Sequence, residues 1–194
     1  MTFETDCIIL IKRGGLIIRK CMMSFRSLPK NIKFKIPAVV TFPGTKINMV
    51  SCEIRGNNDV ITAGCIFINS DVLLSACKFY NLRGGAVFVS STMSNEVKIS
   101  DTEITKSGVI GIYAQGPASK PKLIRNSING VEGVAIRVHR GCNAKIKGCE
   151  IEKCNMGIEV VSSDPLIIMN TISSCIENGI YSYSKGALMC APEI

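Results

Sequence analysis

Residues 149–160, CEIEKCNMGIEV, decide the fold. The stretch holds a Cys-x-Ile pair, a small residue at Cys154, and a Gly157-Ile158-x-Val160 block. The same frame recurs about six times in this 194-residue chain, at steps of 21 to 25 residues. Its apolar patches alternate with period two and are separated by turn residues, which is typical of short strands and not of helices. The repeat therefore predicts a parallel β-helix, in which each coil stacks on the one before it.

Equivalent residues of successive coils should stack at the strand spacing of about 4.8 Å. One column lies two residues before a large apolar residue and comprises Cys52, Cys77, Thr102, Asn126, Cys149 and Asn170. We expect it to point inward near a corner, where asparagine side chains can hydrogen-bond the turn backbone. The apolar block begins at Ile66, Val87, Ile112, Ile136, Ile158 and Ile180. Upstream, we expect Leu10, Ile18 and Met23 to continue the inward frame.

Composition places the chain among globular proteins. Hydrophobic residues make up 46% and mean hydropathy is +0.28, which excludes a disordered chain. No apolar run reaches the roughly 18 residues of a membrane span, and the first residues lack the pattern of a signal peptide. We expect an intracellular protein, in the cytoplasm, whose ten cysteines stay reduced. The sequence has no Cys-x-x-Cys pair, and its only histidine, His139, is expected in a turn, so no metal or cofactor is predicted.

The net charge of +8 is concentrated near the start of the chain. Residues 1–46 hold nine Lys/Arg and two acids, whereas residues 47–194 hold fourteen and thirteen. Much of the excess lies in a basic arm with Arg26, Lys30, Lys33 and Lys35. The arm is either a solvated face or a docking segment for an acidic partner. Nucleic acid is disfavoured, because Phe25 and Phe34 are the arm's only aromatic residues.

Two outward columns are candidate binding surfaces. The first, an aromatic column, is predicted to contain Phe67, Phe88, Tyr113, Arg137, Glu159 and Tyr181. Exposed apolar side chains usually mark contacts, so we expect a protein partner; sugar stacking, or cover by the 55–63 insertion, is the alternative. The second is a basic ladder of Lys98, Lys122 and Lys145. Its stacked charges either attract an acidic partner or protect the sheet against aggregation.

The later repeats carry a family resemblance. It rests on Ser163-Asp164-Pro165-Leu166-Ile167, on Asn170-x-Ile172, on Asn178-Gly179-Ile180-Tyr181 and on a related run at 121–128. Over residues 47–186 the chain resembles the right-handed β-helix repeats of the pectin-lyase-like superfamily. Within it, the nearest likeness is to the CASH-type repeats of F-box-only β-helix proteins. The resemblance implies a fold, and fold alone does not carry function.

The predicted fold class is all-β: a right-handed, single-stranded parallel β-helix of about six to seven coils of 21–25 residues. One domain should span residues 1–194, with regular coils over 47–186. We expect residues 1–46 to form an irregular basic first coil with an insertion near 27–37, and 187–194 to start a truncated coil. The coil ends would expose unpaired strand edges, so we expect protein partners to cover them.

Catalysis is not predicted. Resembling polysaccharide enzymes use clustered acids on an outer sheet face, and a general acid–base pair needs two carboxylates roughly 5–10 Å apart. Glu159 is the one acid in the aromatic column. Asp101 and Glu103 are the closest acids on one strand, and we expect them to be a turn residue and a face residue. In the outward column that contains Glu53, Lys78, Glu103 and Glu150, we expect the acids to pair with charges of neighbouring coils. We therefore expect a non-catalytic scaffold or adaptor in a larger assembly. The alternatives are a substrate-recognition module of a ubiquitin-ligase adaptor and a carbohydrate-binding or polysaccharide-cleaving protein.

Overall fold

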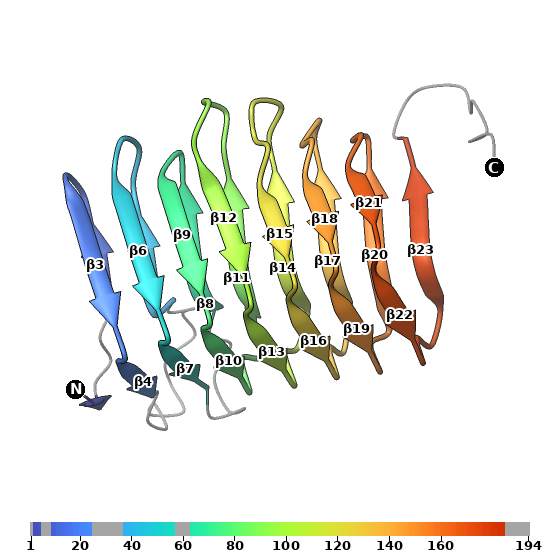
Figure 1. Cartoon of the computed structure of the whole chain (residues 1–194), viewed down its shortest axis with the longest axis horizontal. Coiled ribbons are helices and arrows are strands. Elements are labelled where there is room, and N and C mark those ends of the chain that lie inside the picture. The colour runs from blue at the N-terminus through green and yellow to red at the C-terminus, as the bar shows by residue number, and fades with distance from the viewer. Residues whose placement is uncertain (1, 5–8, 25–36, 57–62, 185–194) are drawn as a thin grey trace, which may run out of the picture.

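The computed structural model describes residues 2–4, 9–24, 37–56 and 63–184. All regular structure in these ranges is β-strand, so none of them contains a helix that could cross a membrane. Figure 1 shows the coils side by side, from the N-terminus at one end of the stack to β23 (Asn178–Tyr183) at the other. The long axis of the molecule is therefore the axis of stacking.

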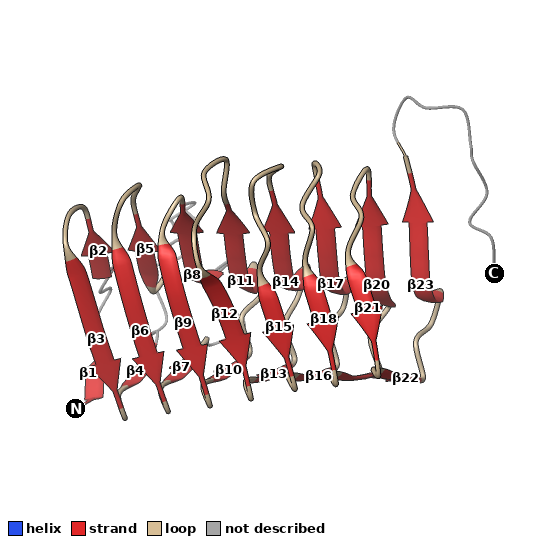
Figure 2. Ribbon diagram, turned by 45° about the horizontal axis from the view of Figure 1, so that its top comes forward, coloured by secondary structure: helices blue, strands red, loops and turns tan. Residues whose placement is uncertain are grey.

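Strands of neighbouring coils pair in parallel and build three sheets, which each described coil visits in the order A, B, C (Figure 2). Sheet A contains β1 (Thr2–Glu4), β4 (Met22–Ser24), β7 (Glu53–Arg55), β10 (Lys78–Tyr80), β13 (Glu103–Thr105), β16 (Ser127–Asn129), β19 (Glu150–Glu152) and β22 (Thr171–Ser173). Sheet B contains β2 (Ile9–Ile11), β5 (Val39–Thr41), β8 (Ala63–Ile68), β11 (Gly85–Ser90), β14 (Ile110–Gln115), β17 (Val134–His139), β20 (Met156–Val161) and β23. Sheet C contains β3 (Gly15–Arg19), β6 (Lys46–Val50), β9 (Asp71–Ser75), β12 (Val97–Ser100), β15 (Lys122–Ile124), β18 (Lys145–Lys147) and β21 (Leu166–Ile168).

The predicted fold class is confirmed: the chain is a right-handed parallel β-helix. Pairing joins residues of the same frame position, as when Ile104 of β13 lies opposite Ile128 of β16. Alternation within each strand sends one residue into the coil and the next to its surface. The inward column of sheet A is almost completely buried and comprises Ile54, Phe79, Ile104, Ile128 and Ile151. The core is thus a stack of like side chains along the axis.

A polar ladder lines the corner between sheets C and A. Asn126 accepts from the Thr102 N–H at 3.1 Å and donates to the Ile99 carbonyl at 3.0 Å. Asn170 makes the same two bonds to the coil that precedes it, with the Cys149 N–H at 2.8 Å and the Ile146 carbonyl at 3.0 Å. The expected asparagine-to-turn bonds are therefore confirmed. Each amide satisfies a buried donor and a buried acceptor of the coil before it.

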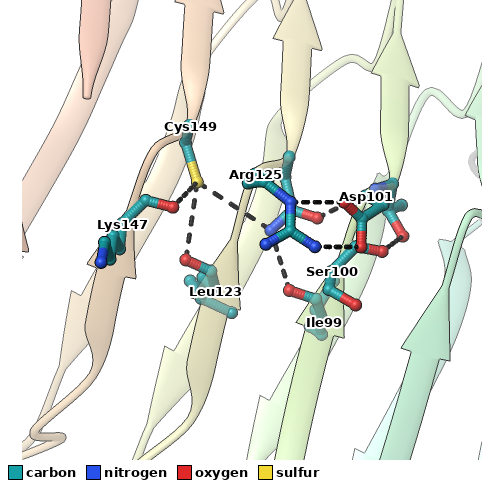
Figure 3. A network of polar contacts seen from close by, with 9 residues as sticks. Ile99, Ser100, Asp101, Leu123, Arg125, Lys147 and Cys149 are labelled. Carbon is teal, nitrogen blue, oxygen red and sulfur yellow. Dashed lines mark hydrogen bonds and ion pairs between the residues drawn. The ribbon is translucent and has the colours of Figure 1, made fainter. Parts of the chain in front are cut away.

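Cysteine fills the same corner position with weaker contacts. The Cys149 Sγ lies 3.6 Å from the Leu123 carbonyl oxygen, as Figure 3 shows beside the Arg125–Asp101 pair. The residue before this position is left-handed in successive coils, with φ of 54° at Asp101 and 50° at Arg125. One such residue turns the chain sharply between two strands. Every cysteine in the described ranges is a free thiol, as the sequence predicted.

Three details of the predicted frame are wrong. In β8, Cys65 lies opposite Val87, so the inward frame runs through Cys65 and Phe67 and not through Ile66. Phe67 is consequently a core residue, 1% exposed, and does not belong to the outward column. The predicted frame of β2 is also wrong by one residue, because Leu10 lies on the outer face and is 47% exposed. Ile18 and Met23 are buried, as expected. His139 also departs from its expected turn, because it ends β17.

Some predicted segments lie outside the described residues. They are most of the 27–37 insertion and all of 187–194. Residues 9–24 of the first coil already follow the common register, because Ile18 of β3 lies opposite Met49 of β6.

Candidate binding face

The outer face of sheet B presents one column that changes character along the axis. By the register of the sheet it runs through Leu10, Val40, Ile66, Phe88, Tyr113, Arg137, Glu159 and Tyr181. Its first three residues are aliphatic, the next two are aromatic, and the last three carry charged or hydroxyl groups. Five of the six residues predicted for the aromatic column are therefore brought together.

Ile66 takes the place that was predicted for Phe67. The sequence signal for this assignment is Gly64, which precedes Cys65 as Gly111 precedes Ile112. A Cβ on Gly64 would lie 2.5 Å from the Ala86 carbonyl oxygen, so a side chain does not fit at this step of the frame. Cysteine is a small apolar residue that packs in cores. If Cys65 is taken as an inward residue, the alternation of the strand also points Phe67 into the core.

A groove follows the middle of the column, from Ile66 to Arg137. Its volume is about 340 Å³, and its lining comprises Pro37, Ala63, Ile66, Gly84, Phe88, Val109, Ile110, Tyr113 and Arg137. The Phe88 and Tyr113 rings are tilted at 56° with centroids 6.1 Å apart, a favourable aromatic geometry. Arg137 supplies the one charged group of the lining. The alternative prediction was that the 55–63 insertion covers this column. Most of that insertion, residues 57–62, lies outside the described ranges.

Beyond the groove the column continues as a polar cluster. The Arg137 guanidinium pairs with the Glu159 carboxylate, whose residue is only 6% exposed. The Tyr183 hydroxyl donates to the other oxygen of the same carboxylate at 3.3 Å. Desolvation, and then the nearby Glu159 charge, raise the pKa of Tyr183. The phenol therefore stays protonated and keeps donating to the carboxylate near neutral pH.

Tyr113 joins the groove to a second polar row. Its hydroxyl lies 2.9 Å from Gln115 Oε1 and 2.9 Å from His139 Nδ1. The Gln115 amide in turn donates to Ser90 Oγ at 3.1 Å. Partial burial raises the pKa of the Tyr113 hydroxyl. The ring is thus held in one orientation by bonds to Gln115 and His139, within a network that spans three coils, which gives the groove a defined wall.

The acids that were weighed for catalysis are paired with cations. Asp101 Oδ1 lies 2.8 Å from Arg125 Nε, and this bond lowers the pKa of Asp101. Glu103 lies 3.2 Å from Lys78 Nζ on the neighbouring strand, and Glu159 is bound by Arg137. The expected charge pairing between neighbouring coils is confirmed for Glu103, whereas Glu53, for which the same pairing was expected, is bound by Arg55 of its own strand at 3.0 Å. Within the described ranges, His, Cys, Asp and Glu side chains form no cluster of three suited to a metal ion.

The basic ladder is assembled as predicted, on the outer face of sheet C. Lys98 lies opposite Lys122, and Lys122 lies opposite Lys145. All three are exposed, and the ion pairs among the described residues join other groups. The basic arm with Arg26, Lys30, Lys33 and Lys35 lies outside the described ranges.

Comparison with known proteins identifies the repeat. A family model described as a right handed beta helix region matches residues 37–190. No curated protein and no solved structure matches the chain. The matched range covers sheets A, B and C from β5 onward, and so includes all the lining residues of the groove, the polar cluster and the basic ladder.

Proposed function

Since the chain belongs to the right-handed β-helix family, we propose that it is a non-catalytic scaffold or adaptor that holds a protein partner on the outer face of sheet B. The family specifies a fold that serves enzymes and binding proteins alike, so the argument rests on the site. The observation that carries the proposal is the apolar groove along Ile66, Phe88 and Tyr113.

The groove suits a protein side chain or short segment. Apolar and aromatic walls with few polar groups are typical of contact surfaces, and aromatic residues dominate the energy of such contacts. Its rigid construction also helps, because strands on a packed core lose little freedom when a partner binds. Arg137, ion-paired with Glu159, gives the groove a polar end that orients the partner.

The pairing of the acids supports a non-catalytic role. A general acid must release a proton to substrate and a general base must accept one, which requires a carboxylate free to reach the substrate. Asp101, Glu103 and Glu159 are each engaged with a cation instead. We infer an intracellular location from the eight free thiols of the described ranges, since thiols persist in reducing compartments.

Photocrosslinking at the groove tests the proposal. A photoreactive phenylalanine analogue is placed at Phe88, and at Tyr80 in a matched control. Tyr80 is also a half-buried aromatic residue, but it lies in sheet A, where Arg55 stacks on its ring at 5.3 Å. The expected result is a discrete protein adduct from cells at position 88 that is weak or absent at position 80.

Phe88→Glu should abolish recovery of that same partner, while Tyr80→Glu should leave it. Equal recovery with both variants would overturn the groove as the docking site. A crosslinked partner that is a cullin-type ligase subunit would instead support the ubiquitin-ligase alternative. Release of reducing sugar from a polysaccharide by the wild-type protein would overturn the non-catalytic role.

A further inference from the structure

The outer face of sheet C carries a run of positive charge that the groove does not use. Strands β12, β15, β18 and β21 read VKIS, KLI, KIK and LII, and contain four lysines and no acid. Lys98, Lys122 and Lys145 form the basic ladder, and Lys147 follows two residues after Lys145 on the same face. Figure 1 shows β12, β15 and β18 as adjacent strands on one side of the stack.

Stacked lysines at this spacing repel one another. Successive residues of the ladder are separated by one strand spacing, about 4.8 Å. Ion pairs relieve similar crowding elsewhere on this protein, as between Lys78 and Glu103 at 3.2 Å in sheet A. Within the part of the chain that the structure describes, no ion pair does so for the ladder. The ladder is therefore complementary to a row of negative charges supplied from outside.

Within the column, a leucine follows the ladder at each end. The register continues from Lys98 to Leu73 in β9 on one side and from Lys145 to Leu166 in β21 on the other. At the first end, Leu73 and Lys98 also line a hollow of about 140 Å³, whose lining includes the acids Asp71 and Glu96 as well as Lys46. The column thus reads leucine, three lysines, leucine along the axis of the molecule.

We propose that this column binds an extended acidic peptide segment of a protein partner, with carboxylates over the three lysines and apolar side chains over Leu73 and Leu166. Four strand steps separate the two leucines, a span of about 19 Å. An extended chain covers that span with about six residues. The matching segment is therefore a short acidic run between two apolar residues.

Other polyanions fit this face less well. Proteins that bind single-stranded nucleic acid combine cations with aromatic side chains on which bases stack. No aromatic residue occurs in β3, β6, β9, β12, β15, β18 or β21. The inference shares with the proposed function only the premise that the partner is a protein, since the groove and the ladder lie on different sheets.

Fluorescence anisotropy with a labelled peptide of about seven residues, glutamates between two terminal leucines, tests the inference. The expected result is saturable binding that Lys98→Glu/Lys122→Glu/Lys145→Glu weakens at least tenfold. The matched control, Lys12→Glu/Lys106→Glu/Lys153→Glu, changes the net charge equally at exposed residues outside sheet C and should weaken it less than threefold. Salt raised from about 0.05 M to about 0.5 M should reduce wild-type binding, because the contacts are exposed charge pairs.

Several outcomes would overturn the inference. They are unchanged affinity in the ladder variant, equal loss in the two triple variants, and equal binding of a peptide with glutamine in place of glutamate. Binding of single-stranded DNA or anionic vesicles that the ladder variant alone abolishes, without peptide binding, would also overturn it. A neutral variant, Lys98→Gln/Lys122→Gln/Lys145→Gln, with circular dichroism as a check on folding, separates lost charge from lost structure. Phe88→Glu should leave peptide binding unchanged, which distinguishes failure of the ladder from failure of the groove.

Discussion

Arg137 on β17 is ion-paired with Glu159 on the adjacent strand β20, and the glutamate is almost completely buried although it points to the outer face of sheet B. A buried carboxylate is costly without a partner, because it has lost its hydration. Arg137 and Tyr183 both bind the Glu159 carboxylate, and these contacts replace the water that the carboxylate has lost. The ion pair also forms the rigid polar end of the groove.

Arg137→Leu should destabilise the protein by about 1–3 kcal/mol, because it leaves the Glu159 carboxylate buried without its cation. The double variant Arg137→Leu/Glu159→Gln should recover part of that loss, since an amide tolerates burial better than a charge. Urea denaturation of the two single variants, the double variant and the wild type measures the coupling. Additive losses would show that the two side chains do not stabilise one another.

Phe67→Ala should cost about 3–5 kcal/mol, whereas Ile66→Ala should cost about 1 kcal/mol, because only the phenylalanine is fully buried. The two residues are neighbours in sequence, so each serves as the control for the other. Thermal and chemical unfolding report the difference. An equal or reversed order would contradict the register of β8.

Asn126→Ala should cost about 2–3 kcal/mol, because it leaves the buried Thr102 N–H and Ile99 carbonyl without their partner. Cys149→Ala at the equivalent corner should cost about 1 kcal/mol, since its sulfur makes weaker and longer contacts. Hydrogen exchange at Thr102 provides a local readout, with faster exchange expected in the asparagine variant alone. Unchanged exchange at that amide would contradict the hydrogen bond from the Thr102 N–H to Asn126.

Alkaline pH should destabilise the protein partly through Cys142, because burial raises the pKa of its thiol to about 11. The unfolded thiol ionises near its ordinary pKa of about 8.5–9, so stability is full below that pH and is lost as pH rises toward 11. Between about pH 9 and pH 10 this single group should account for about 1 kcal/mol. Cys142→Ala should show a correspondingly shallower decline in the free energy of unfolding. Parallel pH profiles for variant and wild type would contradict this assignment.

Much of the architecture was readable from the chain. The column through Met49, Leu74 and Ile99, the corner asparagines and the basic ladder follow directly from a repeat of 21 to 25 residues, and the strand register agrees with each. Repetition makes this reliable, because a residue is assigned from several coils at once. The predicted register of β8 was wrong because Cys65 occupies an inward position that holds a large apolar residue in other coils. Two frames one residue apart therefore fitted the sequence of this strand.

The sequence by itself determined which residues recur, and hence the coil length, the inward columns and the stacking of like side chains. Those properties follow from short-range alternation and from the fixed spacing of strands, which any chain with this repeat must obey. The tertiary structure alone decided how deep the groove beside Phe88 is, and that Glu159 is buried by Arg137 and Tyr183. Such properties depend on the turn geometry and side-chain directions of several coils together, and no single repeat contains that information.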